Sequence, residues 1–113
     1  MESQLDEKRR FARIKFKSPV SLQVRGVSNL ENAACDNISE GGIGFINNKF
    51  IPPETLVMLE INVLSRILRP IGRIVSSLAL PHCSRNRLGI EFLEFDHNEK
   101  EYLREFVDMQ VAR

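Results

Sequence analysis

Two arginines, Arg9 and Arg13, stand four residues apart near the beginning of the chain. That spacing places both side chains on one face, whether the segment is helical or extended. Guanidinium groups donate paired hydrogen bonds to phosphate and to guanine O6 and N7, and they stack on base planes. The pair therefore suits a ligand that bears phosphate or guanine, although on charge alone a solvated basic arm is the simpler explanation.

A second polar segment runs from Asp36 to Gly42. Asn37 and Ser39 are two residues apart, so their side chains share a face if the backbone is extended. An asparagine amide can bond a base edge or a ribose, and a serine hydroxyl can bond a ribose or a phosphate. The glycines at its end allow a ligand to approach the backbone closely. Taken alone, the segment is also typical of an ordinary turn between two strands.

Alternation of apolar and polar residues predicts the strands that must position these side chains. The predicted strands cover residues 14–24, 33–38, 43–46, 56–63, 68–80 and 88–92. Pro19 lies within the first of them, which predicts an edge strand or a bulge at that point. Six short strands separated by frequent turns predict an all-β fold, a small antiparallel barrel.

Only the end of the chain has helical periodicity. Leu103, Phe106 and Val107 form an apolar stripe, which is expected to pack on the sheet or on a partner chain. Asp96, followed three residues later by Glu99, predicts a capping box at the beginning of this helix.

The composition limits the classes of function. The 113 residues provide one domain, and the formal net charge is +1. Residues 8–17 hold six basic side chains and no acidic one, whereas residues 91–108 hold seven acidic and two basic ones. This sorting suits one specific anionic ligand and argues against a general nucleic-acid binder. Aromatic residues are only 7% and tryptophan is absent, which disfavours a single-stranded nucleic-acid binder that stacks bases.

Several other classes are disfavoured by what the sequence lacks. Cys35 and Cys83 have no zinc-like spacing, and we expect two reduced thiols and no metal. No apolar run approaches the length of a membrane span, and no signal peptide is recognisable, so we expect a cytoplasmic protein without membrane insertion. No nucleophile lies near a base, so we expect no enzymatic activity.

Together, the two polar segments resemble the PilZ domain family. Its signature, R-x-x-x-R before a first strand and [D/N]-x-S-x-x-G about twenty residues later, appears here as Arg9-x-x-x-Arg13 and Asn37-x-Ser39-x-x-Gly42. The predicted strands after the second motif also follow in the family's order, and the resemblance covers about residues 8–110. It implies a six-stranded antiparallel β-barrel with a C-terminal α-helix (residues 14–113), preceded by a flexible arm (residues 1–13).

The resemblance also implies a function, that of a bacterial receptor for cyclic di-GMP. The expected ligand-binding residues are Arg9, Arg13, Asn37, Ser39 and Gly42, followed in rank by Lys8, Arg10 and Asp36. Asparagine at position 37, where aspartate is common, is expected to weaken a contact with guanine. A basic residue at position 8 favours two bound ligands over one.

A downstream partner is expected too. Ligand binding would order the arm and signal to a protein partner, with flagellar motility or exopolysaccharide and biofilm machinery as possibilities. The alternative is an adaptor that keeps the fold and acts by protein contact alone, through its acidic C-terminal helix.

Overall fold

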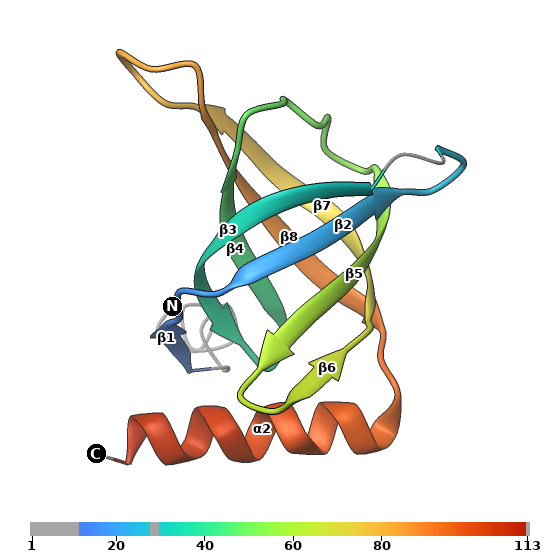
Figure 1. Cartoon of the computed structure of the whole chain (residues 1–113), viewed down its shortest axis with the longest axis vertical. Coiled ribbons are helices and arrows are strands. Elements are labelled where there is room, and N and C mark those ends of the chain that lie inside the picture. The colour runs from blue at the N-terminus through green and yellow to red at the C-terminus, as the bar shows by residue number, and fades with distance from the viewer. Residues whose placement is uncertain (1–11, 28–29, 113) are drawn as a thin grey trace, which may run out of the picture.

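Six strands close into an antiparallel barrel, and one helix lies across an end of it (Figure 1). The computed structural model describes residues 12–27 and 30–112. Its elements are β1 (Arg13–Lys15), β2 (Pro19–Val24), β3 (Leu30–Ser39), β4 (Gly42–Asn47), β5 (Leu56–Val63), β6 (Arg66–Leu68), β7 (Ile71–Ala79), β8 (Asn86–Glu94) and α2 (His97–Val111).

The barrel contains β3, β2, β5, β7, β8 and β4 in that spatial order, and pairing of β4 with β3 closes it. All of these pairs are antiparallel. The short strand β1 extends β3 at one edge, and β6 folds back on β5. The predicted six-stranded antiparallel barrel with a C-terminal helix is therefore confirmed.

Alternating side chains fill the barrel interior. Along β5, every second residue from Val57 to Val63 is at most 2% exposed, and the residues between them face outward. Phe45 on β4 and Leu88 on β8 are fully buried in the same core. Burial of one face of each strand fixes the register, because a slip of one residue would turn the apolar set to solvent.

Two prolines divide segments that the alternation predicts as continuous strands. The predicted strand 14–24 is two strands in the structure, and Pro19 is the first residue of β2. The predicted strand 68–80 is likewise divided by Pro70, between β6 and β7. Proline has no N–H for the ladder, so it is accommodated where a strand begins. The strand β2 is not an edge strand, because it pairs with both β3 and β5, but Pro19 itself has a register partner only in β3.

The helix α2 packs its apolar stripe on the barrel. Leu103, Phe106 and Val107 are at most 7% exposed, and the ring of Phe106 meets that of Phe16 edge-on with centroids 5.5 Å apart. The hydroxyl of Tyr102 donates to the carbonyl of Val63 at 3.1 Å, which ties the helix to β5. The stripe therefore belongs to the core. None of the described helices is long and apolar enough to cross a membrane.

Only half of the predicted capping box forms. Asp96 is the N-cap, and its side chain accepts from the backbone N–H groups of Asn98 and Glu99. The Glu99 carboxylate does not return to Asp96; it accepts from the backbone N–H of Arg69 at 2.8 Å. The helix thereby satisfies a backbone donor in the break between β6 and β7.

Candidate functional site

A β-bulge in β3 turns two neighbouring polar side chains, Asp36 and Asn37, to the outer face of the barrel. Successive residues of β4 pair with Cys35 and with Asn37, which leaves Asp36 as the extra residue. The flanking side chains, Cys35 and Ile38, are 3% and 0% exposed, whereas Asp36 and Asn37 are half-buried. The bulge therefore presents an amide and a carboxylate side by side.

A chain of hydrogen bonds connects these two groups to arginines from two other strands. The guanidinium of Arg13 on β1 donates to Oδ1 of Asn37, and Nδ2 of Asn37 donates to Oδ2 of Asp36 at 3.2 Å. Arg87 on β8 donates to the same Asp36 oxygen from Nη1 at 2.6 Å. This bond, above all, lowers the pKa of the Asp36 carboxyl below its ordinary value. Asp36 is therefore an anion that fixes Arg87.

One row of paired residues crosses four strands at the level of Asn37. Asn37 on β3 pairs with Gly44 on β4, Gly44 with Gly89 on β8, and Gly89 with Ser76 on β7. A β-carbon on Gly44 would lie 2.9 Å from Nδ2 of Asn37, and one on Gly89 would lie 2.6 Å from Oγ of Ser76. Glycine at both positions leaves room for the polar side chains at the two ends of the row.

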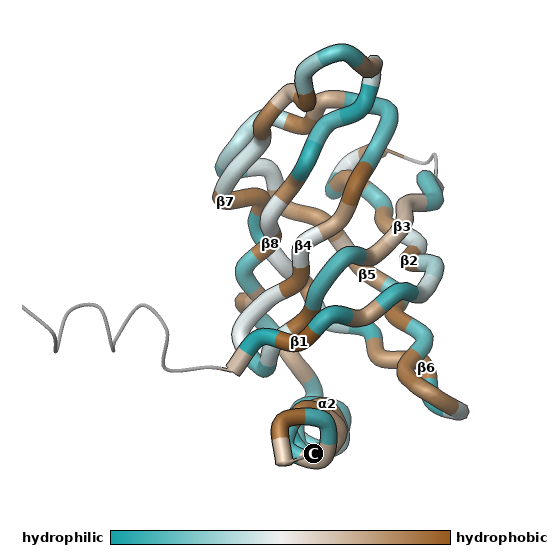
Figure 2. Tube along the Cα trace, turned by 90° about the vertical axis from the view of Figure 1, so that its left-hand side faces the viewer, coloured by the Kyte–Doolittle hydropathy of each residue, from teal (hydrophilic) through white to brown (hydrophobic). Residues whose placement is uncertain are grey.

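A cavity of about 300 Å³ lies over this glycine pair (Gly44 and Gly89). Its polar lining comes from Arg13, Asn37, Ser76 and Arg87. Figure 2 shows β4 and β8 side by side on this face of the barrel, with β1 close to α2. The volume is at the lower end of the range for small-molecule sites. It accommodates one part of a larger ligand and leaves the remainder above the surface.

Ser39 and Gly42, the later part of the second polar segment, build the turn between β3 and β4. The Ser39 side chain is buried, and its Oγ accepts from the backbone N–H groups of Gly41 and Gly42, each at 3.2 Å. A β-carbon on Gly42 would lie 2.3 Å from the carbonyl oxygen of Ile90. Neither residue lines the cavity. In this geometry they hold the turn, while Asn37 is directed to the cavity.

A model of the PilZ domain family matches residues 7–109 of the chain. The chain belongs to the PilZ domain family. The match covers both motifs and the whole barrel, and it confirms the resemblance seen in the sequence. Among curated proteins, no significant sequence match is found.

Several solved structures have the same fold. Inhibitor of motility (MotI/DgrA) from Bacillus subtilis superposes with a TM-score of 0.80 at 15% identity, over 92% of this chain and 51% of that one. The PilZ domain of Escherichia coli YcgR with c-di-GMP has a TM-score of 0.69 at 15% identity, over 94% and 95%. The complex of K. pneumonia MrkH with c-di-GMP has a TM-score of 0.67 at 15% identity, over 92% and 51%. The chain thus spans about half the length of MotI/DgrA and of MrkH.

The PilZ motif residues predicted from the sequence occupy three different settings. Arg13 and Asn37 are joined by a hydrogen bond and both line the cavity. Asp36 lies beside them and binds Arg87, and Ser39 and Gly42 lie in the turn. Arg9, with its neighbours Lys8 and Arg10, lies outside the described residues.

The cavity over the glycine pair is also lined by residues that were not predicted as site residues, among them Gly44, Ser76, Arg87 and Gly89. Two signals were available. Gly44 and Gly89 each lie between two apolar residues of a strand, which is typical of a close approach by another group. The sequence Cys35-Asp36-Asn37-Ile38 places two polar residues between two apolar ones, which breaks the alternation and indicates a bulge.

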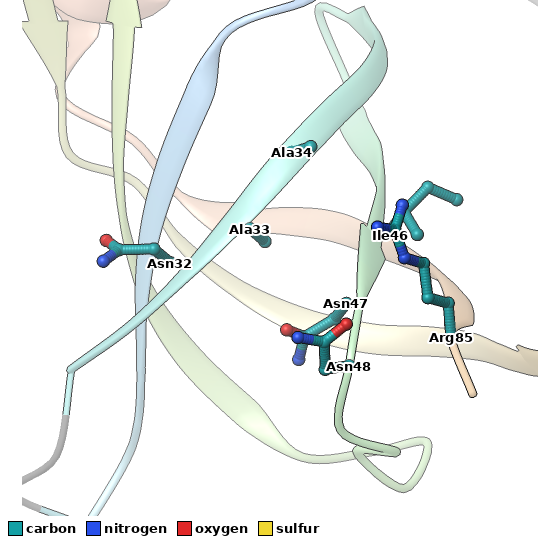
Figure 3. Close-up of a pocket in the computed structure, with 7 residues that line it drawn as sticks. All are labelled: Asn32, Ala33, Ala34, Ile46, Asn47, Asn48 and Arg85. Carbon is teal, nitrogen blue, oxygen red and sulfur yellow. The ribbon is translucent and has the colours of Figure 1, made fainter. Parts of the chain in front are cut away.

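A second cavity, of about 250 Å³, lies further along β3 and β4 (Figure 3). Figure 3 shows asparagine side chains and Arg85 around it. The most buried of these amides, that of Asn47, donates to Oε1 of Glu31 and to the carbonyl of Lys49, each at 3.3 Å. Those bonds satisfy both hydrogens of the Asn47 amide within the protein. The cavity over the glycine pair is therefore the stronger ligand-site candidate.

Proposed function

We propose that this PilZ domain is a receptor for cyclic di-GMP and that the cavity over the glycine pair is part of its binding site. The observation that carries the proposal is the pairing of Arg13 with Asn37 on that cavity, which brings residues of both family motifs together. The structural similarity to the PilZ domain of YcgR and to MrkH, both solved with c-di-GMP, supports it. No catalytic step is proposed.

Arg13 has the chemistry to bind a phosphate of the ligand. Its described side-chain partner is a neutral amide, so its positive charge is not compensated within that pair. A guanidinium forms paired, charge-assisted hydrogen bonds with phosphate oxygens. A cyclic dinucleotide has two phosphates, and we propose that Arg9, with Lys8 and Arg10 in support, supplies the remaining positive charge.

We further propose that ligand binding changes the surface that the domain offers to a protein partner in the cytoplasm. Motility machinery is one candidate, because MotI/DgrA is an inhibitor of motility; exopolysaccharide machinery is another. One or two ligand molecules are compatible with this arrangement. The apolar stripe of α2 does not support the alternative adaptor function, because Leu103, Phe106 and Val107 are buried against the barrel and are not exposed for a partner protein.

Isothermal titration calorimetry with cyclic di-GMP tests the proposal and gives the stoichiometry. Arg13→Ala is expected to weaken binding about tenfold to a hundredfold, which corresponds to the loss of a hydrogen bond to a charged group. Arg25→Ala is the matched control, because Arg25 is exposed and follows β2, away from the cavity lining. Absence of saturable binding by the unchanged protein would overturn the proposed function; equal affinities of the two variants would overturn the role of Arg13.

A further inference from the structure

The two described arginines of the cavity differ in the charge of their partners. Arg13 donates to the neutral Asn37 amide, whereas Arg87 donates to the Asp36 carboxylate at 2.6 Å. An ion pair reduces the net charge that Arg87 presents, but it leaves other guanidinium N–H donors available. Arg13 therefore suits an anionic group, and Arg87 suits a neutral group with two hydrogen-bond acceptors.

The two arginines approach the glycine pair from opposite directions along the strands. In the ladder between β1 and β3, Arg13 lies opposite Ser39, and Ser39 is nearer than Asn37 to the turn between β3 and β4. Arg87 pairs with Ile46, on the opposite side of the row formed by Asn37, Gly44 and Gly89. A group on the glycine pair consequently lies between the strand positions of the two arginines, and both guanidinium groups are hydrogen-bonded to β3, at the Asn37 end of the row.

The surface between the arginines suits a planar group. Gly44 and Gly89 contribute backbone without side chains, and β7 limits the far side. A register shift between Ile74 and Ser76 marks a second bulge, at Val75, and Val75 is 47% exposed at the cavity. An apolar Val75 side chain next to flat backbone is a favourable contact for the face or edge of a nucleobase.

We propose that Arg87 is a specificity-determining residue, which binds the O6 and N7 acceptors of a guanine lying on the glycine pair. Asp36 is then the positioning residue that orients Arg87. This inference rests on the proposed function, because it assigns a role within the same cyclic di-GMP site. Arginine forms a bidentate pair with guanine O6 and N7, and adenine presents an amino donor in place of O6. An adenine in this position would place its amino group, a donor, against an N–H donor of the guanidinium.

Titration of the full chain with cyclic di-GMP and with its 7-deazaguanine analogue tests the inference. The analogue lacks the N7 acceptor, so the unchanged protein is expected to bind it about tenfold more weakly. Arg87→Gln is expected to bind cyclic di-GMP about tenfold to a hundredfold more weakly than the unchanged protein. It is also expected to bind the two ligands with nearly equal affinity.

Arg85→Gln is the matched control. It removes the same charge two residues away, on the hairpin that leads into β8, and Arg85 lines the other cavity (Figure 3). This variant is expected to keep both the affinity and the discrimination against the analogue. Arg87→Lys keeps a cation beside Asp36 but loses the guanidinium fork, so it is expected to melt near the unchanged protein and still lose discrimination.

The outcomes separate this inference from the proposed function. If the unchanged protein does not bind cyclic di-GMP, the proposed function fails. If the unchanged protein binds both ligands equally, or if Arg87→Gln and Arg85→Gln bind cyclic di-GMP with the same affinity, the receptor function stands and the role of Arg87 is overturned. Asp36→Asn, with Arg87 intact but no longer held by a carboxylate, is expected to lose part of the discrimination.

Discussion

Gly42 on β4 lies so close to the backbone of Ile90 on β8 that a β-carbon on Gly42 would be 2.3 Å from the Ile90 carbonyl oxygen. Backbone atoms form this contact, so no side-chain rotation relieves it. We expect Gly42→Ala to lower the free energy of unfolding by about 1–3 kcal/mol, the usual cost of overpacking. Urea denaturation followed by circular dichroism measures it.

Gly26→Asn is a suitable control for this prediction. Gly26 has a positive φ of 85°, but a β-carbon there meets nothing within 4 Å. Asparagine tolerates positive φ better than most residues, so we expect a loss below about 1 kcal/mol. Equal stability of Gly42→Ala and the unchanged protein would contradict the close approach of β4 and β8.

The buried hydroxyl of Ser39 gives a second prediction. Ser39 Oγ accepts from the N–H groups of Gly41 and Gly42, and the Ser39 side chain is 2% exposed. Ser39→Ala leaves these donors without that acceptor, at an expected cost of about 1–3 kcal/mol in unfolding free energy. Thermal melting checks this loss before any change in ligand affinity is assigned to direct contact.

Ser21→Ala provides the comparison for Ser39→Ala. The Ser21 hydroxyl also takes part in a hydrogen bond, with Oδ1 of Asn32 at 3.2 Å, but it lies at the barrel surface where water can replace the partner. We expect a change within about 0.5 kcal/mol. If Ser39→Ala were as stable as Ser21→Ala, the serine of the motif would not hold the turn.

The barrel could be predicted from the sequence because its determinants are local. Alternation such as that of Val57, Leu59 and Ile61 with the polar residues between them specifies a strand and its buried face without knowledge of its neighbours. The N-cap at Asp96 was equally visible, since a capping side chain bonds to N–H groups two and three residues away.

The electrostatic arrangement of the site could not be predicted in the same way. Asp36 and Arg87 are 51 residues apart, and their contact depends on a bulge that shifts the register of β3 against β4. Glu99 has the spacing from Asp96 that a capping box requires, but its carboxylate accepts from the N–H of Arg69, which is distant in the sequence. Register and long-range pairing decide both contacts, and neither leaves a periodic signal in the sequence.

The ion pair of Asp36 with Arg87 gives a third prediction, on stability against pH. The pKa of Asp36 is lowered from its ordinary 3.8 in the folded protein, chiefly by the hydrogen bond from Arg87. The stabilisation by this ion pair is therefore complete at a pH above the pKa of Asp36 in the unfolded chain. It is lost as the pH falls through the pKa of Asp36 in the folded protein. A surface pair is worth about 0.2–1 kcal/mol, and Asp36→Asn should lower the melting temperature by a few degrees at pH 6.

Melting curves from pH 6 down to pH 3 test the sign of this dependence. The difference in melting temperature between the unchanged protein and Asp36→Asn should stay constant above about pH 5 and become smaller below about pH 4. Glu60→Gln removes a carboxylate from another exposed ion pair, with Arg69 at 3.2 Å, and it controls for the change in net charge. A gap that widens on acidification would contradict the lowered pKa.

The thiol of Cys35 gives the last prediction, because its location on the bulge strand makes it unreactive. Cys35 is 3% exposed, and burial, with the nearby Asp36 carboxylate, raises its pKa to about 12. The nucleophile in thiol reagents is the thiolate, so Cys35 should stay unmodified in the folded protein at pH 8. Cys83 is exposed, and a disulfide-exchange reagent should therefore react with one thiol per chain in the folded protein and with two in urea.

The variant Cys83→Ser removes the reaction of the folded protein and leaves only the reaction in urea. The rate of Cys35 modification in this variant therefore reports how often the strand behind the candidate site opens. Fast native modification of Cys83→Ser would show that β3 is not held as the structure describes.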